Sequence, residues 1–164
     1  GGWAEVDRAW TRGALTTEQV LHPEKWVSGE AAIEVEAPTF AALGEGYVRA
    51  SVDTHGELGL RLVLEAAMPH ARATEVASGW GGDRSVVVRR AATAALAWRV
   101  RRDDDASAER AFHAISAAFA RGRACSDERA APTGVTRKGR DVLLLVGPPG
   151  SSCALLAAWS REVL

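Results

Sequence analysis

The fold is decided by Ser85-Val86-Val87-Val88-Arg89-Arg90 and Ala95-Leu96-Ala97-Trp98-Arg99-Val100-Arg101-Arg102, two runs of β-forming residues separated by a short alanine–threonine loop. In the second run, Leu96, Trp98 and Val100 alternate with smaller or charged residues, so one face of this strand is expected to be buried and the other solvated. The two runs predict a hairpin at about residues 85–102, in the centre of an antiparallel sheet.

A glycine-rich hexapeptide, Gly79-Trp80-Gly81-Gly82-Asp83-Arg84, comes directly before the hairpin. Glycine allows backbone angles that are closed to other residues, and tryptophan supplies a large apolar surface. The hexapeptide is therefore either a turn or the rim of a site. We interpret it as a turn that leads the chain into the hairpin, with Trp80 packed as an anchor. Asp83 and Arg84 are expected to pair locally or to brace the N-terminal segment.

Helices and further strands are predicted on both sides of the hairpin. Capping boxes at residues 16–19 and 54–57 predict a helix that starts at Thr17 and stops at Pro23, and a second helix that ends before Pro69. The other predicted elements are a strand at 33–36, a helix at 106–120, a strand at 141–146 and a helix from about Ser152. This order is typical of an α+β domain with helices packed on one face of an antiparallel sheet.

Length and composition indicate one globular domain. The chain has 164 residues, of which 47% are hydrophobic and 25% charged, and we assign residues 1–164 to a single α+β domain with an irregular, Trp-rich segment at 1–40. The net charge of −1 argues against a nucleic-acid partner. The sequence contains no run of 18 apolar residues, the length that would predict a transmembrane segment. The two cysteines, Cys125 and Cys153, form either one disulfide or two unpaired thiols.

Several known catalytic patterns are missing. Gly147-Pro148-Pro149-Gly150 follows a predicted strand, but the prolines have no N–H to offer a phosphate and no lysine follows. The histidines form no H-E-x-x-H pattern, and the aspartates at 103–105 lack the spacing of a calcium loop and are better explained as a helix cap. We therefore predict no catalytic residue, no metal site and no cofactor.

Two patches of the sequence resemble a known family. Residues 16–26, which read TTEQVLHPEKW, are similar to the STEQILHPEKY segment of certain bacterial secreted or lipoprotein-type proteins. In those proteins a later GWGGDR patch precedes a strand, an aromatic-centred strand and an acidic helix start, and residues 79–84, Trp98 and residues 103–105 follow the same order here.

Members of that family resemble zinc metallopeptidases with an upstream H-E-x-x-H helix. That helix is missing from this sequence, and no position matches the metal ligands. The resemblance implies an extracytoplasmic protein, periplasmic or at the cell surface, whose partner is a peptidase domain of the same or another chain.

These observations lead to three functional hypotheses. The first is a non-catalytic interaction or regulatory module associated with an extracytoplasmic metallopeptidase-like protein. The second is a stand-alone module that binds a peptide, a glycan or a small ligand, and the third is an enzyme with a dispersed acid/base site. The candidate binding residues are His22, Glu24, Trp26, Trp80, Asp83 and Arg84.

Overall fold

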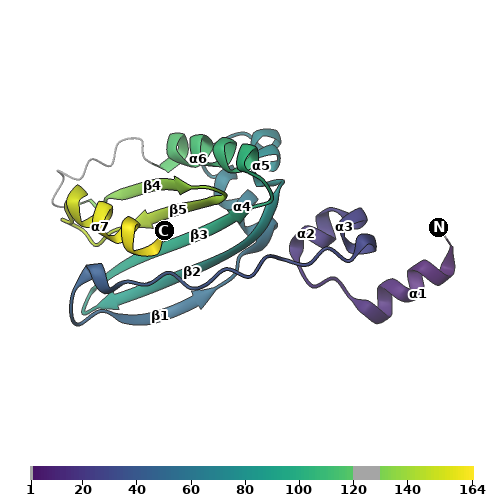
Figure 1. Ribbon diagram of the computed structural model, residues 1–164, viewed down its shortest axis with the longest axis horizontal. Helices are drawn as coiled ribbons and strands as arrows, with labels where there is room; N and C mark the ends of the chain where they lie inside the picture. The colour runs from purple at the N-terminus through teal and green to yellow at the C-terminus, as the bar shows by residue number, and fades with distance from the viewer. Residues whose placement is uncertain (1, 120–129) are drawn as a thin grey trace.

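The computed structural model describes residues 2–119 and 130–164, and its centre is a five-stranded antiparallel sheet with the order β1-β2-β3-β5-β4 (Figure 1). The strands are β1 (Val48–Asp53), β2 (Trp80–Arg90), β3 (Thr93–Arg102), β4 (Thr133–Lys138) and β5 (Asp141–Val146). The predicted α+β class and the central hairpin, formed by β2 and β3, are confirmed.

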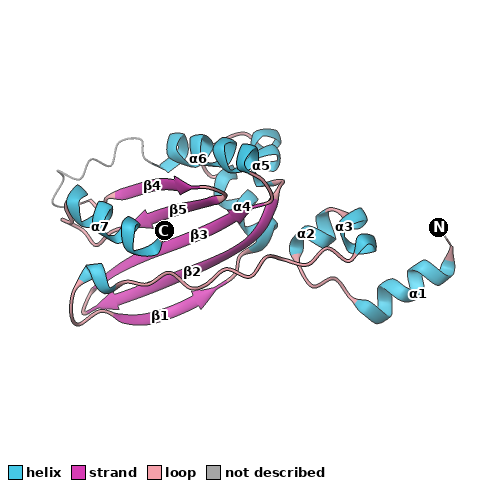
Figure 2. Ribbon diagram, viewed as in Figure 1, coloured by secondary structure: helices cyan, strands magenta, loops and turns pink. Residues whose placement is uncertain are grey.

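Helices pack against both faces of this sheet (Figure 2). On β5, Val142 and Leu144 belong to one apolar cluster and Leu143 and Leu145 to another, because successive side chains of a strand point to opposite faces. The first cluster includes residues of α4 (Gly56–Glu65), α5 (His70–Ala77) and α6 (Asp105–Phe119). The second includes residues of η1 (Ala41–Leu43) and α7 (Cys153–Val163). Thus α4 and α6 share one face as expected, together with α5, which was not predicted, and α7 packs on the opposite face.

Five of the six residues at 79–84 belong to a strand and only Gly79, with a φ of 81°, lies in the turn before it, so the interpretation of the whole hexapeptide as a turn was wrong. Residues 80–84 belong to β2 and pair with the end of β3, with a bulge between Trp80 and Gly82. Trp80 is only 1% exposed, so its expected role as an anchor is confirmed. A Cβ atom on Gly82 would collide with the carbonyl oxygen of Ile33. The glycines are needed because another segment of the chain lies directly on this strand.

That segment contains residues 33–36, which form no strand, so this prediction was also wrong. The chain is extended here, and the N–H of Ile33 donates to the carbonyl of Gly81 at 2.6 Å. Val35 is buried against the sheet while Glu34 and Glu36 face solvent. The alternation that suggested a strand reflects packing on a face of the sheet and not pairing within it.

The N-terminal segment is more regular than predicted. It contains α1 (Trp3–Arg12), α2 (Thr17–Leu21) and α3 (Pro23–Ser28), and Figure 1 shows these helices projecting beyond one end of the sheet. The start of α2 is confirmed, since the hydroxyl of Thr16 accepts the N–H of Gln19 at 3.1 Å. No helix in the described ranges combines the length and apolar character needed to cross a bilayer.

Two other helix starts agree with the sequence. Asp104 accepts the N–H of Ser107 at 2.6 Å at the beginning of α6, and this bond holds the pKa of the Asp104 carboxyl below its ordinary value. Ser152 accepts the N–H of Leu155 at 3.2 Å at the beginning of α7. The aspartates at 103–105 therefore include a helix cap, as expected. The alternatives of one disulfide or two unpaired thiols involve Cys125, which lies outside the described residues.

Candidate functional site

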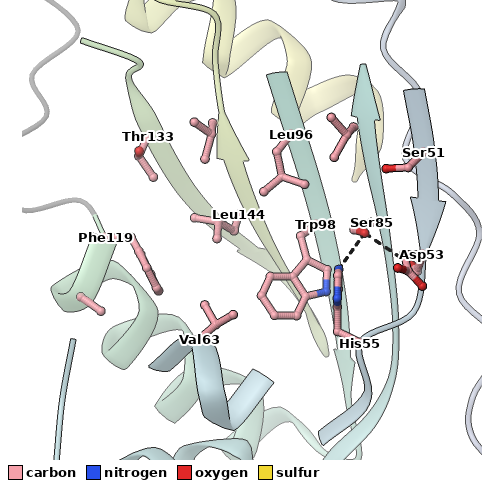
Figure 3. A pocket seen from close by; sticks show the side chains of 13 residues that line it. Ser51, Asp53, His55, Val63, Ser85, Leu96, Trp98, Phe119, Thr133 and Leu144 are labelled. Atoms are coloured by element: carbon pink, nitrogen blue, oxygen red, sulfur yellow. Dashed lines mark hydrogen bonds between the residues drawn. The ribbon is translucent and has the colours of Figure 1, made fainter. Parts of the chain in front are cut away.

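A cavity of about 650 Å³ lies on the face of the sheet that α4 and α6 partly cover (Figure 3). All five strands contribute to its lining. Its apolar side chains are Val63, Val87, Leu96, Trp98, Ala118, Phe119, Leu144 and Val146, and its polar ones are Ser51, Asp53, His55, Ser85 and Thr133. A volume of this size, with few polar groups among apolar ones, is typical of sites for small molecules.

Three residues form one polar end of this cavity. His55 Nε2 lies 2.9 Å from Ser85 Oγ, and the same hydroxyl donates weakly to the carbonyl of Asp53 at 3.5 Å. The imidazole ring contacts the ring of Trp98 edge to face, with centroids 4.8 Å apart. Ser85 is buried, whereas His55 and Asp53 are exposed. The polar end therefore lines the cavity and is also accessible to solvent.

The carboxylate of Asp83 supports this polar end from within the protein. Its Oδ2 accepts the N–H of His55 at 3.0 Å and the indole N–H of Trp98 at 2.8 Å. Its Oδ1 accepts the N–H of Gly56 and the indole N–H of Trp80, both at 2.9 Å. Asp83 is 4% exposed, and a buried carboxylate with four donors fixes the groups around it. Two cavity residues, His55 and Trp98, are thus held by one side chain.

Asp83 also caps α4, which corrects the capping box predicted at residues 54–57. The hydroxyl of Thr54 does not cap the helix but donates to the carbonyl of Asp83 at 3.3 Å. Glu57 does not turn back to its own helix start but is bound by His22. A negative charge at the first turn of a helix is favourable, and here a neighbouring strand provides it.

The hydroxyl–imidazole pair has the separation of a nucleophile and its general base. Such a base is usually oriented by a third group. In residues 2–119 and 130–164, the hydrogen bond of the His55 ring goes to Ser85, and no carboxylate is bonded to it.

The family model described as "Domain of unknown function (DUF8575)" matches residues 42–156, which is more than half of the chain. The chain belongs to the DUF8575 family. No curated protein and no solved structure matches it. The DUF8575 range contains all the described strands and every residue that lines the cavity, whereas the patch at residues 16–26 lies outside it.

Three of the residues singled out in the sequence lie together in the DUF8575 domain. Trp80, Asp83 and Arg84 line a second hollow of about 360 Å³, together with residues 32–37 and Thr54. Asp83 and Arg84 were expected to pair locally or to brace the N-terminal segment, and in the described part of the chain no ion pair joins them. The carboxylate faces the two indoles, and the guanidinium donates to the hydroxyl of Thr54 at 2.9 Å.

The other three residues lie on the N-terminal helices. His22 Nε2 is 2.9 Å from Glu57 Oε1, and its Nδ1 is 3.5 Å from Glu24. The hydrogen bond with buried Glu57 raises the pKa of His22, although burial opposes this. The indole of Trp26 donates to the carbonyl of Gly13 at 3.0 Å, a contact within the N-terminal segment.

The two patches therefore approach the same helical turn from different sides. His22 binds the side chain of Glu57, and Asp83 binds the N–H of Gly56. No hydrogen bond or ion pair connects His22 or Glu24 directly to Asp83 or Arg84 among the residues that the structure describes. This shared turn of α4 also carries His55 and so borders the cavity.

One group of carboxylates has the spacing of a cation site. Oxygen atoms of Glu18, Glu30 and Asp103 lie within 4.8 Å of one another. Lys25 Nζ donates to all three, at 2.7, 2.9 and 3.1 Å respectively. Burial alone would lower the pKa of Lys25, but these three bonds raise it. The lysine ammonium thus provides the positive charge that these carboxylates need.

Asp53, His55 and Ser85 were not predicted as site residues from the sequence. Asp53 ends a strand that was not predicted, His55 was assigned to a capping box, and Ser85 was taken only as the first residue of the hairpin. One signal was available, since Ser85 is a polar residue directly before three valines in a predicted strand.

Proposed function

We propose that this DUF8575 domain binds a small amphipathic molecule in the cavity between the sheet and the helices α4 and α6. The observation that carries the proposal is the cavity itself, about 650 Å³ with an apolar majority and one polar end. The apolar part of the ligand would contact Trp98, Leu144 and Phe119. Its polar part would contact the pair formed by His55 and Ser85.

The hydrogen bonds that Asp83 accepts from two cavity residues favour this function. Asp83 holds the backbone of His55 and the indole of Trp98 in place before any ligand arrives. A site with positions fixed in advance loses less entropy on binding than one that must be ordered by its ligand. The buried charge network is therefore consistent with a preformed binding site.

The test is binding of N-phenyl-1-naphthylamine, an uncharged amphipathic fluorescent probe, with a matched pair of variants on α4. Val63 lines the cavity and is partly exposed, so Val63→Trp is expected to fill space without disturbing the core. Leu62 is the exposed neighbour that does not line the cavity, and Leu62→Trp is the control. We expect probe fluorescence to rise with the unmodified protein and the control, and to be lost with Val63→Trp. Equal binding to all three proteins would place the probe elsewhere and contradict the proposal.

A second proposal concerns the N-terminal segment, which carries several exposed apolar side chains. Trp3, Leu15, Val20 and Val27 are each at least 66% exposed. Clustered apolar surface often marks a protein interface. This favours an interaction module for an extracytoplasmic metallopeptidase-like protein, the association implied by the sequence resemblance.

This second proposal is tested by calorimetric titration against an H-E-x-x-H metallopeptidase domain of the same organism. Binding that is weakened by Leu15→Ser and Val20→Ser would support it. Absence of binding, or binding that both substitutions leave unchanged, would contradict it. Localisation outside the cytoplasm is checked separately by fractionating the cells that express the protein.

A further inference from the structure

Among the described residues that line the cavity, one carries a fixed charge, and that charge is negative. Asp53 is the only carboxylate of this described lining, which contains no lysine or arginine. Figure 3 shows the Asp53 side chain beside His55 at the open, polar end. A ligand whose head group is an anion would meet this carboxylate without a cation to balance it.

The Asp53 carboxylate has hydrogen-bonding capacity to spare. Its Oδ1 accepts the N–H of Thr54 at 2.8 Å, which is the one hydrogen bond of this side chain within the described ranges. No ion pair with Asp53 occurs in the same residues, since Arg84 is directed to Thr54 and Arg99 and Arg101 to Asp141. An ionised carboxylate offers about four lone-pair positions, so it can accept further donors from a ligand.

The aromatic wall beside Asp53 is compatible with a positive charge. The ring of Trp98 lines the cavity next to His55, and the negative face of an indole attracts cations. Leu96 and Leu144 lie beside Trp98 in Figure 3, and Val146 also lines the cavity. A carboxylate, an aromatic ring and an aliphatic surface therefore border the same cavity.

We propose that the ligand of this cavity is a small amphipathic amine, whose ammonium group binds Asp53 and whose hydrocarbon part lies along Trp98 and Leu144. This inference rests on the proposed binding function and adds the charge of the ligand to it. The ammonium group donates to the free positions of the carboxylate, and the chain displaces water from the apolar wall.

The test compares three probes that have the same eight-carbon chain and differ in the head group: octylammonium, octanol and octanoate. Each is titrated into the full chain by calorimetry at one ionic strength. We expect octylammonium to bind about tenfold more tightly than octanoate. The Asp53 carboxylate attracts the ammonium group and repels the carboxylate of octanoate, and at an exposed position each of these effects changes the affinity only modestly. Octanol is expected to lie between them.

Asp53→Asn keeps the shape of the side chain and removes its charge, so it is expected to bring the three affinities together. Asp7→Asn, at an exposed position of α1, is the control and is expected to preserve the preference. Octanoate binding as tightly as octylammonium to the unmodified protein would overturn the inference and leave the binding function standing. Failure of all three probes, together with failure of the uncharged fluorescent probe, would remove the binding function itself.

A fourth titration separates a small amine from a lysine side chain as the source of the ammonium group. A short lysine-containing peptide is expected to bind more weakly than octylammonium, because its backbone cannot follow the aliphatic wall. Tighter binding by the peptide would overturn the assignment to a small molecule.

Discussion

Replacing Asp83 with asparagine tests whether one buried carboxylate holds the site together. Asn has the same shape as Asp but only one acceptor oxygen, and its NH2 group cannot accept a hydrogen bond. In one orientation the NH2 faces Gly56 and the indole of Trp80, and in the other it faces His55 and the indole of Trp98. Either way, two donors lose their acceptor.

The expected cost follows from these two bonds. A hydrogen bond to a charged group contributes about 1.5–3 kcal/mol, so Asp83→Asn should lower the free energy of unfolding by about 3–6 kcal/mol. Domains of this kind have a total stability of about 5–15 kcal/mol, so the variant is expected to fold only weakly. The comparable change at an exposed position, Asp7→Asn, should cost less than about 0.5 kcal/mol.

The assay is urea unfolding followed by circular dichroism and by tryptophan fluorescence. Two of the tryptophans donate to Asp83, so the fluorescence of the folded variant should also change. If Asp83→Asn lowers the free energy of unfolding by less than about 1 kcal/mol, the network does not carry the stability assigned to it, and the reasoning fails.

Three other predictions concern the contacts of the N-terminal segment. Gly82→Ala should lower the free energy of unfolding in urea by about 2 kcal/mol or more, because its methyl group would collide with the backbone of Ile33. Gly134→Ala should cost much less, because its methyl group would lie 3.6 Å from its nearest neighbour. Equal costs for the two variants would contradict this steric explanation. Lys25→Met leaves three carboxylates facing one another, so it should lower the free energy of unfolding by about 2–4 kcal/mol. Millimolar Ca²⁺ should raise the melting temperature of this variant, and a melting temperature unchanged by Ca²⁺ would argue against a cation position between the carboxylates. Glu57 raises the pKa of His22, so the His22–Glu57 hydrogen bond stabilises the fold fully below the ordinary histidine pKa of 6.5, and this stabilisation is lost as the pH rises through the pKa of the folded protein. The difference in free energy of unfolding between the unmodified protein and His22→Gln should therefore shrink over that pH range. A difference that does not change with pH would refute this role of the His22–Glu57 bond.

The sequence was sufficient for the hairpin and for three helix starts, because those features depend on neighbours in the chain. Alternation around Trp98 and the caps at Thr16 and Ser152 are local patterns. The cap of α4 could not be found in this way, because its acceptor, Asp83, is 27 residues from Gly56. The turn assigned to residues 79–84 failed for a similar reason, since the need for glycine arises from a segment far away in the chain.

The candidate site was harder to predict than the fold. Trp80 and Asp83 were identified as special residues, but their partners were not, because hydrogen bonds between strands depend on register. His22 and Asp83 were both named as candidate binding residues, and the structure shows His22 bound to Glu57 and Asp83 bound to Gly56, His55 and the two indoles. The cavity is lined by residues from five strands and two helices, and no short pattern in the sequence indicates such a surface.

The segment that lies across Gly82 has a consequence for how the protein can be divided. The family range begins at residue 42 and ends at 156, yet Val35 before it and Trp159 after it are both buried against the sheet. Trp159 is completely buried, and its indole donates to the carbonyl of Thr39 at 2.7 Å, so the two flanks also hold each other. The unit that is shared among relatives is therefore smaller than the unit that folds. A fragment cut at residues 42 and 156 would expose one face of its own sheet, and it should associate or aggregate where the full chain does not.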